Sequence, residues 1–272
     1  MYSSELKNQL VESIVKKIQN NSSELKKNWE SSAPVRHFYL DDAFDSDLVK
    51  KVSNEFPDSK KLLLRDSIRE RKKVGVELDK YDKILSDFQY TFLDEKLISE
   101  IEKITGIPNL IIDPSFYASG ISVMSQGDFL NPHLDNSHDG DRIAYRVINI
   151  LFYCSVDWKI QNGGNLELWS DDSKEKKLIH SKFNRLVVME TNQTSWHSVN
   201  KILIDAQRNC ISNYYFSIKS PTNKDYFHVT SFRGRPEEFI KNILLKLDSF
   251  SRNLIRKIFP NGIVKSKHRL KK

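Results

Sequence analysis

The middle of the chain has the pattern of an all-β protein. Between residues 111 and 219, short runs rich in valine, isoleucine, phenylalanine and tyrosine alternate with clusters of glycine, asparagine, aspartate and serine. Such short runs between turn-forming residues are typical of a β-sandwich or barrel. The clearest predicted strands are Ile121–Met124, Arg146–Ser155, Leu166–Trp169, Arg185–Glu190 and Cys210–Ile218.

Helical patterns precede the β region. Leucine or isoleucine recurs every four residues from Leu6 to Ile18, after serines that can cap a helix, so the first 20 or so residues predict an amphipathic helix. Residues 33–57 predict a short strand and then a helix, and Phe92–Thr105 predicts a further helix that stops before a glycine. The charged stretch 58–83 has no clear pattern.

Positive charge is concentrated at the C-terminal end. The formal net charge is +7, but from Phe239 onward seven lysines and three arginines accompany a single acid, Asp248, so the rest of the chain is slightly acidic. A helical pattern runs from Pro236 to near Pro260, and we expect its apolar stripe to pack on the β-core. The excess charge in residues 239–272 favours peripheral contact with an anionic membrane rather than with nucleic acid.

Composition and cysteine content exclude several classes of protein. With 39% hydrophobic and 29% charged residues, the chain resembles ordinary soluble proteins. Its two cysteines, Cys154 and Cys210, lie in separate apolar stretches and support neither a disulfide framework nor a cysteine-based zinc site. No stretch resembles a signal peptide or a membrane span. We therefore expect a cytoplasmic protein, with possible peripheral contact at the inner face of the membrane.

Three residues of the β region can form a metal site. Residues two apart on a strand point to the same face, so His133 and Asp135 can direct an imidazole and a carboxylate at one ion. His197 follows the strand Arg185–Glu190 after a polar turn and can supply a third ligand. Two histidines and one aspartate leave three open octahedral positions, which suits ferrous iron better than zinc. The other histidines have no partners at ligand spacing: His37, His138, His180, His228 and His268.

An arginine downstream of this set suits a carboxylate ligand. Arg208 begins a predicted strand eleven residues beyond His197, and a guanidinium makes two parallel hydrogen bonds to a carboxylate. Ser212 lies four residues on, on the same face of the strand, and could add a hydroxyl bond. A surface ion pair is the alternative interpretation of Arg208.

These residues stand in an ordered series of motifs. Residues 121–217 closely resemble the prolyl-4-hydroxylase-like branch of the Fe(II)/2-oxoglutarate oxygenases, including bacterial members. The matching motifs are Gly127, His133-Leu-Asp135, Arg146-Val-Ile-Asn149, Phe152-Tyr153, Asp157-Trp158, Gly163-Gly164-Asn-Leu-Glu-Leu-Trp169, Phe183-Asn-Arg185, His197-Ser, and Arg208 before Tyr214-Tyr215-Phe216.

The resemblance implies a fold and a set of roles. The fold would be mainly β with added helices (α+β): a double-stranded β-helix, or jelly roll, with N-terminal helices and a C-terminal basic helix. His133, Asp135 and His197 would bind Fe(II). Arg208 and Ser212 would hold the distal carboxylate of 2-oxoglutarate, with a phenol from Tyr153. The enzyme would use O2 to hydroxylate an unactivated C–H bond, releasing succinate and CO2.

The same resemblance predicts an organisation around one catalytic domain. Residues 1–110 would be a supporting region, residues 111–220 the β-helix core and residues 221–272 a basic helical extension. Gly163 and Gly164 would serve a tight hairpin turn that needs positive φ angles. Three tryptophans, Trp158, Trp169 and Trp196, are expected in the core rather than at a binding surface.

The substrate is the least constrained part of the prediction. The Gly-Gly-x-Leu-Glu-Leu-Trp strand and the segment Ser231–Pro236 resemble enzymes that modify cell-surface glycans or lipid-linked sugars, such as Kdo of lipopolysaccharide. The alternatives are a peptidyl-proline or other protein hydroxylase, a non-catalytic β-sandwich binding module, and an oxygenase acting on nucleic-acid bases. The intact metal set argues against the non-catalytic alternative.

Overall fold

The computed structural model describes residues 3–113, 115–172 and 174–259. Its α-helices are α1 (Glu5–Asn20), α2 (Ser22–Ser31), α3 (Ser46–Asn54), α4 (Lys83–Thr91), α5 (Glu95–Thr105) and α6 (Phe239–Ile258). Its strands are β1 (His37–Leu40), β2 (Leu63–Asp66), β3 (Glu70–Gly75), β4 (Ile111–Ile112), β5 (Gly120–Met124), β6 (Phe129–Leu134), β7 (Tyr145–Tyr153), β8 (Leu166–Trp169), β9 (Lys176–Ile179), β10 (Arg185–Glu190), β11 (His197–Val199), β12 (Arg208–Ser217) and β13 (Ser231–Phe232). The five predicted strands correspond to β5, β7, β8, β10 and β12.

The N-terminal elements follow their local sequence signals. The side chain of Ser4 accepts a hydrogen bond from the backbone of Lys7 and caps α1, whose leucine and isoleucine stripe is buried. Asp45 caps α3 in the same way, by accepting from the backbone of Leu48. The predicted first helix and the predicted strand followed by a helix are both confirmed. Helix α2 was not predicted.

The helix expected over Phe92–Thr105 is shorter than predicted. The chain forms α4 up to Thr91 and α5 from Glu95, because the side chain of Asp94 caps a new helix by accepting from the backbone of Lys96. Phe92 lies in the break and is fully buried. Gly106 ends α5 with a left-handed φ of 70°, as the glycine there predicted. The unassigned stretch before α4 contains the hairpin β2–β3.

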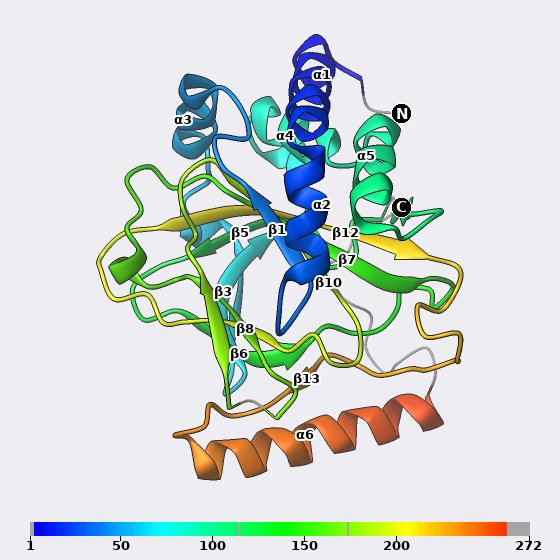
Figure 1. Cartoon of the computed structure of the whole chain (residues 1–272). Helices are drawn as coiled ribbons and strands as arrows, with labels where there is room; N and C mark the ends of the chain where they lie inside the picture. Colours follow the sequence, from blue (N-terminus) through cyan, green and yellow to red (C-terminus); the bar gives the residue numbers. More distant parts are fainter. Residues whose placement is uncertain (1–2, 114, 173, 260–272) are drawn as a thin grey trace.

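The strands form one hydrogen-bonded path that folds into two halves. Its order is β1-β10-β7-β12-β5-β3-β6-β11-β8-β9, and neighbours along it are antiparallel. β3 joins the halves, because it pairs with both β5 and β6. Helices α1 to α5 lie on one side of the molecule, over the first half (Figure 1). The strand order places β6 and β11, which carry the predicted metal ligands, side by side in the second half.

Alternating side chains of the first half separate the core from the site. On β7 and β12, residues such as Phe152, Ile211 and Tyr215 point toward the helices and belong to the main hydrophobic core. Their neighbours Tyr153 and Cys210 belong to a second cluster, shared with β8 and β10. This two-residue period directs the remaining side chains of the same strands toward the predicted site.

Several smaller predictions can be compared with the structure. Cys154 and Cys210 are free and buried, and the three tryptophans expected in the core are at most 5% exposed. Gly163 and Gly164 have the expected positive φ angles of 78° and 69°. The hairpin expected there is wrong, because β8 pairs with β11 and β9 and not with β7. A side chain at Gly163 would instead collide with the carbonyl oxygen of Lys201, at 2.0 Å.

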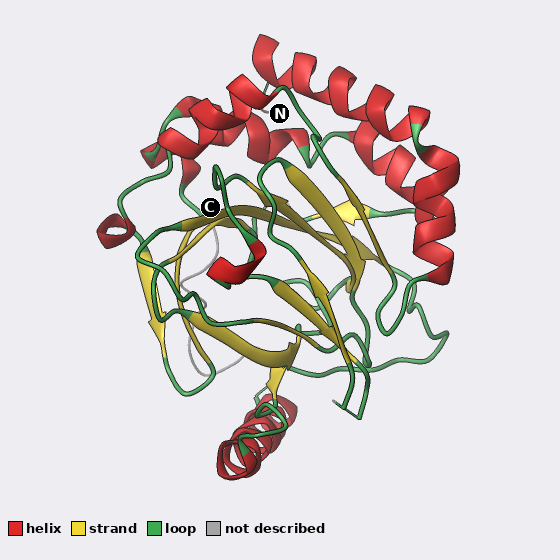
Figure 2. Ribbon diagram, turned by 60° about the vertical axis from the view of Figure 1, so that its left-hand side comes forward, coloured by secondary structure: helices red, strands yellow, loops and turns green. Residues whose placement is uncertain are grey.

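Helix α6 lies apart from the other helices, on the opposite side of the molecule (Figures 1 and 2). The predicted helix begins three residues later than expected, at Phe239. The expectation that its apolar stripe packs on the β-core is wrong, because the stripe faces outward. The basic end of the predicted extension, residues 260–272, lies outside the described residues. In the described part of the chain, no helix is both long enough and apolar enough to cross a membrane.

The predicted division into regions stays a prediction. Strands β1 and β3 come from the proposed supporting region 1–110, yet both are hydrogen-bonded within the sheet of the proposed core. The N-terminal helices share one hydrophobic core with β7 and β12. The supporting region therefore packs as part of the same core.

Candidate metal centre

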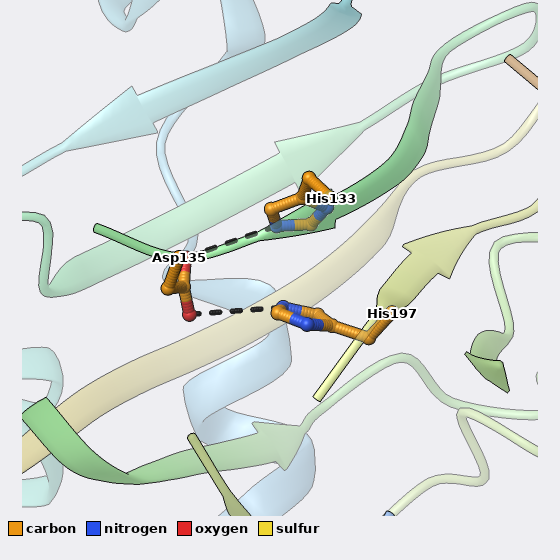
Figure 3. A group of neighbouring side chains, drawn as sticks. All are labelled: His133, Asp135 and His197. Carbon is orange, nitrogen blue, oxygen red and sulfur yellow. Dashed lines mark ion pairs between the residues drawn. The ribbon is translucent and has the colours of Figure 1, made fainter. Parts of the chain in front are cut away.

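The three predicted ligands converge on one point. His133 on β6 pairs directly with His197 on β11, so the two rings lie on the same face, with centroids 4.0 Å apart. Asp135 follows β6 and places its carboxylate between them (Figure 3). Its two oxygens lie 3.8 Å from Nε2 of His133 and 3.7 Å from Nε2 of His197. Within the described residues, this is the one group of three or more such side chains that converges in this way.

Backbone contacts orient both imidazoles for metal binding. Nδ1 of His133 lies 3.0 Å from the carbonyl oxygen of Asn131, and Nδ1 of His197 lies 3.0 Å from that of Ser195. A carbonyl only accepts hydrogen bonds, so each Nδ1 donates its proton there, and Nε2 is the nitrogen that faces the point where the ligand atoms converge. This is the arrangement of histidines that ligate metals.

The electrostatics of the group also suit a cation. Burial, reinforced by repulsion from His197, lowers the pKa of His133 to about 3, which keeps the ring neutral. Burial alone would raise the pKa of Asp135, but attraction to His197 and Arg146 outweighs it and lowers that pKa, so the carboxylate stays charged. One oxygen of Asp135, Oδ2, is buried and accepts no hydrogen bond. Two imidazole nitrogens and one anionic oxygen without a hydrogen bond fit a divalent metal with open positions.

A buried guanidinium lies at the start of β12. Arg208 is 4% exposed, and its Nε and Nη1 have no hydrogen-bond partner among the described residues. An unpaired buried charge is costly, and a guanidinium matches a carboxylate with two parallel hydrogen bonds. The alternative of a surface ion pair is therefore wrong, and the donors of Arg208 are available for an external carboxylate.

Tyr153 accompanies this guanidinium. Its ring centre lies 5.2 Å from the guanidinium carbon of Arg208, and its buried hydroxyl has no hydrogen-bond partner in the described structure. Burial raises the pKa of Tyr153, which keeps the phenol protonated and able to donate. Gly164 makes room for the arginine, because a β-carbon there would approach Cδ of Arg208 to 2.8 Å. The guanidinium of Arg208 and the phenol of Tyr153 can both donate to the distal carboxylate of a dicarboxylate cosubstrate.

The structure gives Ser212 a different contact. Its hydroxyl lies 3.3 Å from the carbonyl oxygen of Gly120 and can donate to it. Ser212 shares a face with Arg208, but four residues of extended strand span about 13 Å. The role of Ser212 at the carboxylate of 2-oxoglutarate stays a prediction. The contact with Gly120 does not support it. Cys210 is the residue of β12 that lies opposite Tyr153.

The sequence of this region matches a known family. Residues 119–216 match the profile of the 2OG-Fe(II) oxygenase superfamily, and this stretch contains the three converging residues as well as Arg208 and Tyr153. Over residues 119–216 the chain is therefore similar to the 2OG-Fe(II) oxygenase superfamily. The predicted enzyme class, with Fe(II), 2-oxoglutarate and O2 as its requirements, is therefore confirmed.

Solved structures agree with the fold. A prolyl-4-hydroxylase from Pseudomonas putida is 16% identical, with a TM-score of 0.53 over 72% of this chain and 100% of its own. A prolyl 4-hydroxylase from Phytophthora capsici is 16% identical, with a TM-score of 0.54 over 91% and 77%. An oxidoreductase of the 2OG-Fe(II) oxygenase family from Burkholderia pseudomallei is 12% identical, with a TM-score of 0.51 over 72% and 90%. The double-stranded β-helix is confirmed. No curated protein matches the sequence.

The oxygenase has further polar residues at the centre that the site prediction missed. Arg146 on β7 is 2% exposed, and its Nη1 lies 3.5 Å from Oδ1 of Asp135. Its guanidinium carbon lies 3.8 Å above the ring of Tyr214, and burial together with the charge of Asp135 raises the pKa of Tyr214. Nε and Nη2 of Arg146 have no partner among the described residues. An arginine within the otherwise mostly apolar strand Tyr145–Tyr153 was the signal that could have identified it.

Another missed group comes from the segment after β12. Nε2 of His228 and the hydroxyl of Tyr226 are buried without hydrogen-bond partners in the described structure, and their rings stack 5.9 Å apart. Burial lowers the pKa of His228, and the charges of Asp135 and Arg146 also act on it. The sequence left His228 unassigned because it has no neighbour at ligand spacing. Only the folding of the chain brings it near Asp135.

Proposed function

We propose that His133, Asp135 and His197 bind the ferrous iron of this oxygenase, and that Arg208 and Tyr153 hold the distal carboxylate of 2-oxoglutarate. One observation carries this assignment: the chain has both three converging ligand atoms and the buried guanidinium of Arg208, whose donors have no partner in the described structure. Iron with bound 2-oxoglutarate supplies the activation of O2, and the balanced reaction turns R–H, 2-oxoglutarate and O2 into R–OH, succinate and CO2.

The protein's own residues fix the geometry of this reaction. The carbonyls of Asn131 and Ser195 hold the two imidazoles in one tautomer. Arg146 helps to hold the carboxylate of Asp135, because its Nη1 lies 3.5 Å from Oδ1. Because all of these groups are largely buried, water has little access to the reacting atoms.

The ligand assignment is tested by replacing one residue at a time. His133→Ala, Asp135→Ala and His197→Ala should each abolish succinate formation and weaken Mn(II) binding, measured by calorimetry. His180→Ala is a suitable control, because Nε2 of His180 contacts only the carbonyl oxygen of Trp158, at 2.8 Å. If the Asp135 variant forms succinate at a near-normal rate, the assignment is wrong.

We further propose that the substrate is acidic and rich in hydroxyl groups: a cell-surface glycan or lipid-linked sugar such as Kdo of lipopolysaccharide. What supports this choice is the second group of unpaired polar atoms, on Arg146, His228 and Tyr226. A sugar carboxylate and its hydroxyls would satisfy a guanidinium, an imidazole and a phenol. A peptidyl proline offers only carbonyl acceptors.

The segment Ser231–Pro236 no longer supports the choice of substrate. Nη1 of Arg235 lies 2.6 Å from the buried carboxylate of Glu167, on β8. Phe232 stacks on the ring of His133, with centroids 5.2 Å apart. Both side chains attach the segment before α6 to the second half of the sheet. These contacts give the segment a structural role, so it does not support a glycan substrate.

Peptidyl-proline hydroxylation is the second candidate. It is supported by the likeness in fold to the prolyl 4-hydroxylases of Pseudomonas putida and Phytophthora capsici. The test offers the purified enzyme Kdo-bearing lipid A or a proline-rich peptide, and measures succinate together with a one-oxygen mass increment in the acceptor. Hydroxylation of the peptide alone would overturn the glycan proposal.

A variant separates substrate binding from metal binding. Arg146→Gln should raise the KM for the acidic acceptor about tenfold or more, because a charge-assisted contact is lost. Since Arg146 also contacts Asp135, Mn(II) affinity is measured in parallel. If metal affinity falls as much as acceptor affinity, Arg146 positions the ligand and does not bind the substrate.

A further inference from the structure

The outer face of α6 is apolar. This helix of 20 residues is about 30 Å long, and nine of its large apolar side chains are at least 40% exposed. They are Phe239, Ile240, Ile243, Leu244, Leu247, Phe250, Leu254, Ile255 and Ile258. They recur at helical spacing and form one continuous stripe. Soluble proteins rarely expose apolar stripes of this size without a binding role.

The inner face of α6 is mainly polar and is hydrogen-bonded to the chain beneath it. The side chain of Ser249 accepts from the backbone of Phe232 at 2.9 Å. Asn253 accepts from the backbone of Val229 at 3.1 Å, and Asn242 accepts from that of Gly234 at 3.2 Å. Leu245 is the apolar exception, fully buried in a cluster with Met124, Trp158 and others. The backbone N–H groups of Val229, Phe232 and Gly234 thus find their hydrogen-bond acceptors on this helix.

An ion pair also holds α6 with its polar face toward the protein. Nε of Arg69, in the loop between β2 and β3, lies 2.8 Å from Oδ2 of Asp248, and Arg252 lies 3.0 Å from the same oxygen. Turning the helix to bury its stripe would break these bonds and leave the backbone N–H groups of Val229, Phe232 and Gly234 without their acceptors. Leaving buried polar groups of this kind unpaired is energetically unfavourable. The outward-facing stripe is therefore a consequence of the contacts on the inner face.

We propose that α6 docks this oxygenase on the surface of an anionic membrane. A helix with a large apolar face and basic flanks lies in the plane of the bilayer interface, with its apolar side chains among the acyl chains. Lys246 and Lys257 are exposed on α6. The sequence after the helix adds Lys265, Lys267, Arg269, Lys271 and Lys272 and no acid, in a stretch outside the described residues. Each such residue near an anionic leaflet strengthens binding about fivefold.

Charge argues against a second copy of the chain as the partner. Pairing two α6 stripes would bring two strongly basic C-terminal regions together, and each region carries ten basic residues against one acid. Like charges at close range repel, whereas an anionic lipid surface attracts both the helix flanks and the residues that follow. The occupant that matches both the apolar stripe and the charge is a bilayer.

The dock lies close to the metal centre in the structure. Ser249 of α6 bonds to the backbone of Phe232, and the ring of Phe232 stacks on His133. One short strand, β13, therefore separates the docking helix from a proposed iron ligand. At the cytoplasmic face this arrangement would suit an acceptor attached to lipid. The docking itself does not depend on which acceptor is used.

Vesicle co-sedimentation tests the proposal. The full chain should sediment with phosphatidylcholine vesicles that contain phosphatidylglycerol and not with phosphatidylcholine alone. Raising the salt from about 50 mM to about 500 mM should weaken binding, because it screens the charges. Leu247→Glu combined with Phe250→Glu should lower the partition coefficient about 100-fold, since two inserted apolar side chains are lost.

A matched double variant controls for the added charge. Leu203→Glu with Ile218→Glu changes two residues of similar exposure, 60% and 59%, that lie outside α6. This variant should bind vesicles as the unmodified chain does. Absence of binding by the unmodified chain, or equal binding by the α6 variant, would overturn the proposal. So would a dimer in analytical ultracentrifugation that the α6 substitutions dissociate, because a second copy would then cover the stripe.

Discussion

Replacing Arg208 with methionine should make the ligand-free enzyme more stable. Arg208 is almost fully buried, and two of its nitrogens have no hydrogen-bond partner in the described structure. Burying a charge without a partner costs several kcal/mol after relaxation. Methionine keeps most of the side-chain length and removes the charge. We expect the free energy of unfolding to rise by about 1–3 kcal/mol, or roughly 2–8 °C in Tm.

The same substitution should remove stabilisation by the cosubstrate. A ligand at 100 times its Kd stabilises the folded protein by about 2.7 kcal/mol. With Mn(II) present, 2-oxoglutarate should therefore raise the Tm of the unmodified enzyme and leave that of Arg208→Met unchanged. Differential scanning calorimetry of both proteins, with and without 2-oxoglutarate, measures the two effects together.

Arg185 provides the matched control. It is also buried, but its Nε lies 2.5 Å from Oδ1 of Asp41 and its Nη2 lies 2.9 Å from Oδ2. Arg185→Met should lower the free energy of unfolding by about 1–2 kcal/mol, a modest loss because Asp41 is partly exposed. It should leave the effect of 2-oxoglutarate intact. If Arg208→Met destabilises the ligand-free enzyme as Arg185→Met does, Arg208 is structural and the reasoning fails.

Three further substitutions have separate expected outcomes. Tyr153→Phe should raise the Kd for 2-oxoglutarate about tenfold without lowering ligand-free stability, since its hydroxyl has no partner in the described structure; a loss of stability in calorimetry would contradict this. Gly164→Ala should weaken 2-oxoglutarate binding and spare Mn(II) binding, because the new β-carbon displaces Arg208; equal loss of both ligands in titrations would count against it. Burial raises the pKa of Glu70, but Lys72 and other cations outweigh it and lower the pKa from 4.5 to about 2. The folded state thus favours the charged carboxylate above pH 4.5, and this stabilisation is lost as the pH falls toward 2. Glu70→Gln should therefore be less stable than the unmodified enzyme at pH 7, by at most about 3 kcal/mol. Urea unfolding should show this difference in stability shrinking below pH 4.5. A difference that stays constant with pH would refute the prediction.

Local patterns were sufficient to predict much of the fold and the proposed metal ligands. The strand period of two placed His133 and Asp135 on one face, and the turn before His197 brought back a third ligand. Caps at Ser4 and Asp45 defined helices from their own neighbours. The placement of His133 with Asp135 and the two helix caps depend on residues close together in the chain, so the sequence alone determines them. His197 joins the two ligands through the pairing of β11 with β6, which is a contact between distant segments.

Contacts between distant segments decided the rest. Arg146 and His228 are more than eighty residues apart in the sequence, and only the folded sheet brings both near Asp135. The orientation of α6 is of the same kind. The periodicity of its sequence defines an apolar face and a polar face, but it does not say which one meets the protein. The tertiary structure decided this because the backbone N–H groups of Val229, Phe232 and Gly234 need hydrogen-bond acceptors. The serine and asparagines of α6 provide them, and the apolar stripe is left facing outward.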